Sequence, residues 1–249
     1  MSNSLTFNGT DLSSYGLLVA RRNLPIRFIV ESGQLLDRSY AGISRLPPKS
    51  ISLDVNVVAA DFATLQGYLD NIQAVLNTQE DVSLILDALN DRYWRARTEA
   101  FIGSYRGPQL WQGVLDFICN DPFAYAIAET SEPYVIDADP DTITITVGGT
   151  AIVSPIYTLS NAGDDFTDIV VENTTTSEAL TWGGTLLAGE ELVIDTSTWY
   201  VYVDGVVSMA VSGQFPTLAP GVVNSIDITS LFSFGNDGAL NITFRDKYI

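Results

Sequence analysis

The 249-residue sequence contains no histidine and one cysteine, Cys119. Without histidine, Ser-His-Asp and Cys-His catalysis are excluded in their usual forms, and the commonest metal ligand is missing. A single cysteine cannot form a disulfide within the chain or a cysteine-cluster zinc site. Cys119 ends the apolar run Phe117–Cys119, where we expect it to be a small buried hydrophobic residue.

Long apolar runs and an excess of positive charge are also missing. No run of about 18 apolar residues occurs, so no membrane insertion is expected. The opening residues, Met1–Phe7, have neither the basic nor the apolar region of a secretory signal peptide. The net charge is −18, with a pI near 4.1. Because such a charge repels phosphates, we expect no specific nucleic-acid binding and no attraction to anionic membranes.

The charge divides the chain into two parts. Residues 1–128 hold ten basic and thirteen acidic residues, which leaves −3. Residues 129–249 hold two basic residues, Arg245 and Lys247, against seventeen acidic ones, which leaves −15. This asymmetry predicts two domains, 1–128 and 129–249, joined by the polar stretch Glu129–Pro133.

The first part combines strands with one helix. Apolar residues recur at helical spacing over Asp61–Asn77, with Asp61 as the N-cap. Two long strands, Tyr93–Ile102 and Gln109–Cys119, are joined by the Gly/Pro-containing loop Gly103–Pro108, which indicates a hairpin. Shorter strands are expected within Phe7–Val19, with Asn8-Gly9 as a turn, and over Ser50–Val57 and Val82–Leu86.

The predicted hairpin carries a set of charged side chains on its polar faces: Arg92, Arg95, Arg97 and Glu99. Exposure to solvent is the default interpretation for them, and a contact between subunits is the alternative. Trp94 and Trp111 lie on the two strands, so we expect them to be cross-strand partners.

The second part is predicted to be entirely β. Thr142–Val147 alternates polar and apolar residues, and Asp204-Gly205 marks a two-residue hairpin turn. Many short strands at regular spacing favour a sandwich or a barrel.

One acidic loop and two tryptophans are candidate binding sites. Asp137–Asp141 begins like a calcium loop, but Thr142 stands where glycine is needed and Gly148 where a bidentate glutamate is needed. A solvated acidic linker is therefore the preferred interpretation. Trp182 is expected in a turn, beside two glycines. Trp182 and Trp199 could form an aromatic platform for sugars, or they could pack in the core. The sequence leaves both interpretations open.

No catalytic motif is present. The sequence has neither a phosphate-binding G-x-x-x-x-G-K-[ST] loop nor a G-x-S-x-G elbow. Adjacent acids such as Glu190-Glu191 point to opposite faces of a strand and make poor glycosidase pairs. We therefore expect no enzymatic activity and no cofactor.

Five segments, taken in order, resemble the siphophage distal tail protein family. They are Leu5–Leu17, Arg45–Ile51, Val114–Tyr125 with its Asp-Pro-Phe close, Leu186–Asp195 and Val211–Ile226. The resemblance covers nearly the whole chain.

This resemblance implies a mainly β fold: an N-terminal β-rich domain with one α-helix and a long hairpin, followed by a galectin-like β-sandwich. It also implies a non-enzymatic hexamer of the tail tip or baseplate that connects the tail tube to the adsorption apparatus and lets DNA pass. The implied partners are the tail tube protein, a tail hub or tail-associated lysin protein, and a receptor-binding protein. The implied location is the virion tail tip, with assembly in the host bacterial cytoplasm.

A ring needs head-to-tail surfaces that close on themselves, and the weakly charged residues 1–128 suit this better than the acidic second domain. We therefore expect the ring to form through the first domain and its channel to be neutral or acidic. The alternative functions are a carbohydrate-binding adhesin with a lectin-like second domain, and a carboxylate-dependent hydrolase with an ancillary sandwich.

Overall fold

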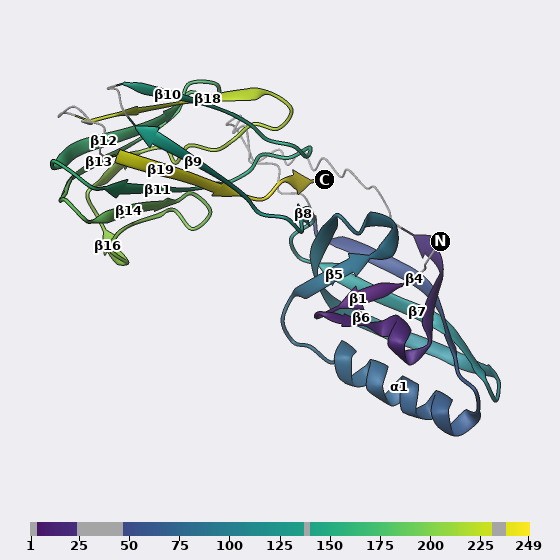
Figure 1. Ribbon diagram of the computed structural model, residues 1–249. Coiled ribbons are helices and arrows are strands. Elements are labelled where there is room, and N and C mark those ends of the chain that lie inside the picture. Colours follow the sequence, from purple (N-terminus) through teal and green to yellow (C-terminus); the bar gives the residue numbers. More distant parts are fainter. Residues whose placement is uncertain (1–3, 24–46, 137–139, 231–237) are drawn as a thin grey trace, which may run out of the picture. The chain divides into compact units, whose positions relative to one another are not determined.

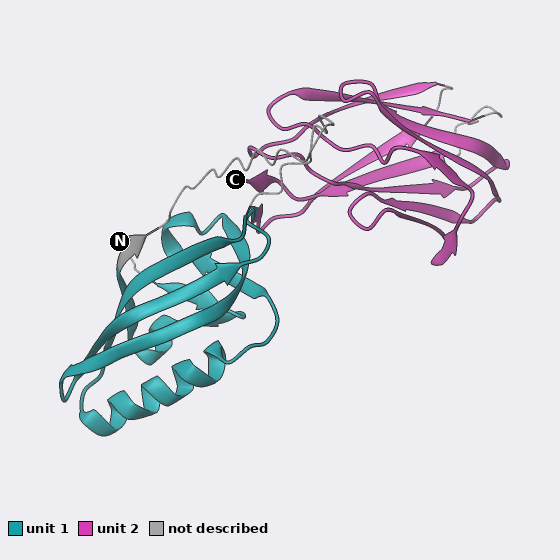
Figure 2. Cartoon of the chain, turned by 180° about the vertical axis from the view of Figure 1, so that it is seen from behind, with its two compact units in different colours: residues 1–124 teal, residues 125–249 magenta. Residues whose placement is uncertain are grey.

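The computed structural model describes residues 4–23, 47–136, 140–230 and 238–249, and the chain forms two compact units (Figure 2). The division falls between Ala124 and Tyr125, a few residues before the predicted one. The stretch Glu129–Pro133, expected to be a linker, is mostly strand, because β9 (Thr130–Ile136) pairs with β19 (Gly238–Phe244). Pro133 is tolerated there because β9 is the last strand of its sheet, where no neighbour needs its missing N–H.

The first unit has the strand order β2-β1-β5-β6-β7-β4-β3, antiparallel throughout (Figure 1). The bounds are β1 (Leu5–Phe7), β2 (Thr10–Asp11), β3 (Leu17–Asn23), β4 (Lys49–Val58), β5 (Val82–Leu86), β6 (Arg92–Gly107) and β7 (Leu110–Cys119), with 3-10 helices at Leu12–Tyr15 and Asp87–Leu89. Asn8 and Gly9 join β1 to β2 with positive φ angles of 50° and 74°, so the predicted turn is confirmed.

The predicted helix is confirmed as α1 (Phe62–Leu76). The Asp61 carboxylate accepts a hydrogen bond from the Thr64 N–H at 2.8 Å, which caps the helix and lowers the pKa of Asp61. The buried face consists of four residues, Leu65, Leu69, Ile72 and Leu76. Phe62, which the helical spacing also places on this face, is instead exposed and lies 5.3 Å from the ring of Tyr105.

The hairpin β6–β7 is longer than predicted, because the expected loop residues Gly103 to Gly107 continue the ladder. Gly103 and Gly113 stand opposite each other, and the Trp111 indole lies against both. A Cβ atom at either glycine would come within 2.4 Å of that ring. The prediction that Trp94 pairs with Trp111 is wrong, since Trp94 faces Leu84 and Trp111 faces Tyr105.

The second unit is a sandwich of two antiparallel sheets, one of the two architectures that the regular spacing of short strands predicted. The five-stranded sheet has the order β10-β18-β12-β13-β17, and the six-stranded sheet has the order β16-β15-β14-β11-β19-β9. The remaining bounds in these two sheets are β10 (Asp141–Thr146), β11 (Ile156–Asn161), β12 (Phe166–Asn173), β13 (Glu178–Leu186), β14 (Glu191–Asp195), β15 (Tyr200–Val203), β16 (Val206–Ser208), β17 (Val211–Gly213) and β18 (Val223–Thr229). The short strands β8 (Ala124–Ala126) and β20 (Lys247–Tyr248) pair with each other and belong to neither sheet of the sandwich.

The core of this unit draws on both sheets and includes Trp182. Trp182 lies within β13 rather than in a turn, and its indole covers the space above Gly184. Its Nε1–H donates to Ser208 at 2.8 Å. The two glycines after Trp182 therefore serve to accommodate the indole and do not end the strand.

A buried amide network fixes the loop between β17 and β18. Asn224 Oδ1 accepts from the Ala219 N–H and from Asn173 Nδ2, and Asn224 Nδ2 donates to the Ala219 carbonyl. Glu178 accepts two hydrogen bonds from Thr217, both at 2.7 Å. These polar contacts tie the loop to the inside of the sandwich.

We expect Gly113→Ala to destabilise the protein by about 1–3 kcal/mol, because the new methyl group would collide with Trp111 and with the Ile102 carbonyl. Gly67→Ala is the matched control. Gly67 is an exposed residue of α1 with nothing near its Cβ position, so the substitution should stabilise by about 0.5–1 kcal/mol. Urea unfolding of both variants would measure the two values, and equal effects would contradict the packing described.

Asn224→Ala should cost about 2–3 kcal/mol, since it leaves several buried polar groups of the loop without partners. Asn241→Ala, at a part-exposed position of β19, should cost about 1 kcal/mol or less. Thermal unfolding would compare them. A loss at Asn224 no larger than that at Asn241 would mean that the network does not hold the loop.

Cys119 is fully buried, as predicted, and burial raises the pKa of its thiol to about 12. The thiolate is the reactive form, and at pH 8 only about one thiol in ten thousand would be ionised. We expect Ellman's reagent to label Cys119 slowly in the native protein and completely in guanidinium. Fast native labelling would show that this part of the core opens.

Candidate contact surfaces

The charged residues predicted on the hairpin all lie on β6, but only two of them share an exposed face. Arg95 and Arg97 are exposed and point away from the core, on the side opposite to buried Trp94 and Ala96. Arg92 is half-buried and pairs with Asp91 at 2.8 Å. The fourth residue, Glu99, occupies a β-bulge between Thr98 and Ala100.

Arg95, Arg97 and Glu99 have no ion-pair partner among the described residues. The two ion pairs found within the described ranges are Arg92–Asp91 and Arg245–Glu129, the latter at 3.7 Å. Two unpaired guanidinium groups are thus available for a carboxylate of another molecule.

The open face of the first unit also carries aliphatic residues. On β6, Ile102 is 71% exposed, and it stands opposite half-buried Val114 of β7. Leu18 and Val58 are exposed near the same face. No described side chain on this face of β4 or β7 is buried, so this part of the chain does not cover it. A partly apolar face with charged groups beside it has the composition of a protein contact.

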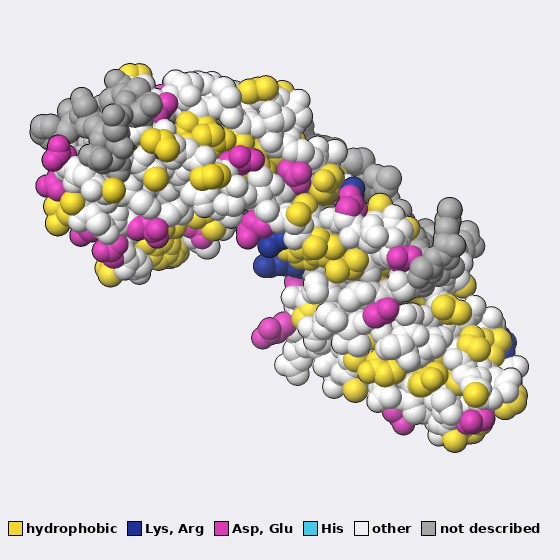
Figure 3. Space-filling view, viewed as in Figure 1, with side chains coloured by type: hydrophobic (Ala, Val, Ile, Leu, Met, Phe, Trp, Pro, Cys, Tyr) yellow, Lys and Arg dark blue, Asp and Glu magenta, His cyan; other side chains and the backbone are white. Residues whose placement is uncertain are grey.

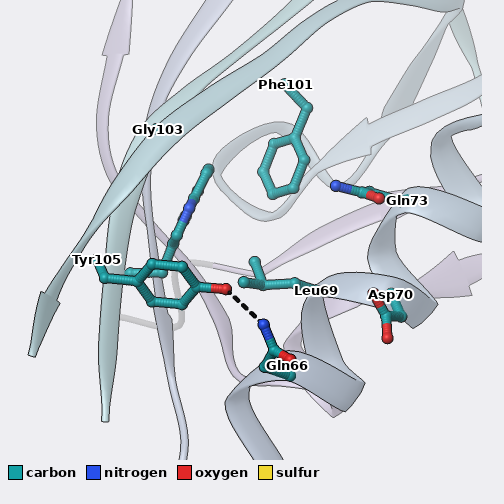
Figure 4. Close-up of a pocket in the computed structure, with 8 residues that line it drawn as sticks. Gln66, Leu69, Asp70, Gln73, Phe101, Gly103 and Tyr105 are labelled. Carbon is teal, nitrogen blue, oxygen red and sulfur yellow. Dashed lines mark hydrogen bonds between the residues drawn. The ribbon is translucent and has the colours of Figure 1, made fainter. Parts of the chain in front are cut away.

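A cleft of about 210 Å³ separates α1 from the hairpin (Figure 4). From the helix side it is lined by Gln66, Leu69, Asp70 and Gln73, and from the hairpin side by Phe101, Gly103, Tyr105 and Trp111. Gln66 Nε2 donates to the Tyr105 hydroxyl at 3.1 Å across it. The cleft is smaller than usual ligand pockets, and Asp70 is its one carboxylate, so it offers no acid–base pair for catalysis.

The two tryptophans considered for sugar binding differ in exposure. Trp182 is in the core and offers no face to a sugar, because Gly184 and Ser208 hold its indole inside the sandwich. Trp199 is 74% exposed and immediately precedes β15. Tyr200 and Tyr202 share one face of β15, as the sequence predicted, with ring centroids 6.1 Å apart. Sugar binding at Trp199 stays a prediction.

Sequence reasoning missed several exposed aliphatic residues: Ile102, Val206, Val207 and Met209. The first follows a β-bulge, which reverses the alternation of inward and outward side chains. The other three lie at a sheet edge, and the order of strands in a sheet leaves no local signal in the sequence.

Asp137 and Asp139 of the considered calcium loop lie outside the described residues. Among the residues that the structure describes, no group of three or more acidic or cysteine side chains could hold a metal ion. No helix in the described ranges is long and apolar enough to cross a membrane.

Comparison with known proteins gives a family match in the second unit and a fold match over the whole chain. The family model described as siphovirus-type tail component, C-terminal domain, matches residues 148–248. The crystal structure of the Dit protein of phage SPP1, described as a paradigm of the hub adsorption apparatus in phages that infect Gram-positive bacteria, matches 100% of both chains, with a TM-score of 0.77 and 16% identity.

Two structures of the phage P2 baseplate in its activated conformation, with Ca and with Sr, give TM-scores of 0.48 and 0.47. They cover 98% and 97% of this chain and of their own chains, at 8% and 9% identity. None of the curated proteins matches the sequence.

The family match lies within the second unit and contains the segments Leu186–Asp195 and Val211–Ile226 on which the resemblance was based. The fold match extends over both units. The predicted resemblance is therefore confirmed at two levels: residues 148–248 match the siphovirus-type tail component family, and the whole chain has the fold of the SPP1 Dit protein.

Proposed function

We propose that six copies of this chain form a ring at the phage tail tip that connects the tail tube to the adsorption apparatus and lets DNA pass. The fold shared over the whole chain with a protein described as an adsorption-apparatus hub carries this proposal. Its partners are the tail tube protein, a tail hub or tail-associated lysin protein, and a receptor-binding protein. The ring is assembled in the host cytoplasm and remains in the virion.

The ring contact lies in the first unit. Copies of a surface must meet head to tail in a closed ring, and each contact joins two different faces of the unit. Ile102 and its neighbours supply apolar area, and Arg95 and Arg97 supply two unpaired positive charges. Residues 1–128 carry only −3, so six copies repel one another weakly.

DNA passage requires a channel that does not retain DNA. A basic lining would bind the duplex by releasing counterions, whereas a neutral or acidic one leaves it free to move. The overall charge of −18 and the excess of acids in both parts of the chain suit this requirement.

The function is structural rather than enzymatic. Histidine is absent from the sequence, and the cleft beside α1 holds a single carboxylate. The cleft therefore does not bring together the nucleophile, base and electrophilic groups that a catalytic site needs.

Native mass spectrometry of the full chain should show a species of six times the 27.0 kDa subunit mass. The double variant Arg95→Glu and Arg97→Glu should raise the dissociation constant of the ring about tenfold or more, because two attractive contacts become repulsive. The matched control reverses two exposed charges of the second unit, Glu132→Arg and Asp165→Arg, and should keep the ring.

A full chain that stays monomeric at every concentration would overturn the ring. A ring that tolerates the arginine changes but is lost in the control would move the contact to the second unit. Circular dichroism of both variants would show that each is folded.

A further inference from the structure

We propose that the exposed β16 edge of the second unit binds an extended, basic segment of a different tail protein, which adds to the six-stranded sheet as a further strand. The β16 edge consists of the three residues of β16 together with Trp199, Tyr200 and Met209. This inference rests on the proposed function only in that it places the chain among other tail proteins.

The edge is strongly apolar and strongly exposed. Val206 is 69% exposed, Met209 is 88% exposed, and Trp199, Tyr200 and Val207 are exposed as well. Hydrophobic side chains are visible at the surface near β16 in Figure 3. These large apolar side chains all belong to the β15–β16 hairpin or lie directly next to it, rather than being scattered singly, which indicates a contact with another molecule.

The turn before β15 holds Trp199 outward in a costly conformation. The Asp195 carboxylate accepts hydrogen bonds from the Ser197 N–H at 2.9 Å and from the Thr198 N–H at 3.2 Å. Trp199 then has a φ of +62°, in the left-handed region that bulky residues rarely adopt. Strain held in place by hydrogen bonds at an exposed aromatic residue points to a selected role for that residue.

β16 is the terminal strand of its sheet, and no described strand pairs with its outer side. Natural edge strands are protected by short length, by charge or by proline. The opposite edge, β9, carries charge and proline, in Glu132 and Pro133. β16 is Val206-Val207-Ser208, a short strand with neither charge nor proline, so its outer backbone groups remain open to an added strand.

Charge decides what the added strand can be. The sequence has no lysine or arginine between Arg106 and Arg245. The charged groups around the edge are acidic: Asp204 in the turn that joins β15 to β16, Glu191, and Asp195. On the face of the second unit visible in Figure 3, acidic side chains are likewise spread among hydrophobic ones. A segment with lysine or arginine between its apolar residues is therefore complementary.

Two other occupants fit less well. A second copy of this chain that paired through its own β16 edge would bring the same acidic side chains against Asp204 and Glu191. A sugar would stack on Trp199, but it gains nothing from Val206, Val207 and Met209, which offer no hydrogen bond to its hydroxyl groups.

A photo-crosslinking amino acid tests the occupant directly. Val207 is replaced by p-benzoylphenylalanine in the full chain assembled into phage tails, and Val135, exposed on the protected edge β9, is replaced in the matched control. We expect irradiation at position 207 to join this chain to another tail protein within a segment that contains lysine or arginine. The yield should exceed that at position 135 about tenfold.

The proposal would be overturned by any of three results. These are a crosslink between two copies of this chain, equal yields at positions 207 and 135, and no crosslink at position 207. The variant Val207→Glu should lower the amount of the crosslinked partner in tails about tenfold, because it places a charge in an apolar contact. Val135→Glu should leave that amount unchanged.

A glycan array probed with the full chain tests whether the edge binds a sugar instead of an added strand. Signal that is abolished by Trp199→Ala but retained in Val207→Glu would identify a lectin site and contradict strand addition, whereas a silent array supports it. Native mass spectrometry of the Val207→Glu chain should still show the ring, so failure of the edge and failure of the ring are separate results.

Discussion

The β-bulge at Glu99 in β6 determines how the first unit is organised. β6 pairs with β5 along Trp94–Ala96 and with β7 from Arg97 onward, so one strand links the two groups of strands. An extra residue in a strand reverses which side chains point inward beyond it. Arg97 before the bulge and Ile102 after it therefore lie on the same open face, although their spacing alone would place them on opposite faces. The bulge brings charge and apolar area together on one surface.

The packing of a tryptophan ring against glycine is a second constraint on the strands, and it occurs in both units. Trp111 lies over Gly103 and Gly113, and Trp182 lies over Gly184. Glycine weakens a strand because it has no side chain to pack, and the indole supplies the missing contact. In the first unit this arrangement extends the hairpin beyond Ile102. In the second it takes Trp182 into the core and leaves Trp199 as the exposed tryptophan.

Local patterns in the sequence predicted the helix, its Asp61 cap, the Asn8-Gly9 turn and most strands, since spacing and turn chemistry are local properties. Errors arose where a residue's neighbour in space decided its role. Gly183-Gly184 resembled a turn because the sequence does not show that the Trp182 ring packs against Gly184. Glu129–Pro133 resembled a linker because proline on an edge strand cannot be distinguished from proline in a loop. The exposure of Val206 and Val207 depends on the strand order, which is set by distant pairing.

The same charge distribution constrains both proposed contacts. At physiological salt, charges interact over about 8–10 Å, so repulsion acts wherever like-charged surfaces touch. A contact between copies of the second unit would bring acidic surfaces together with no base from Gly107 to Phe244 to balance them. The charge distribution therefore favours the first unit for the proposed self-association, because Arg95 and Arg97 can meet a carboxylate there. The apolar β16 edge, with acids around it, then has to be covered by a different and basic chain. In the proposed ring, copies of this chain meet through two different faces of the first unit, and a different protein attaches at the β16 edge.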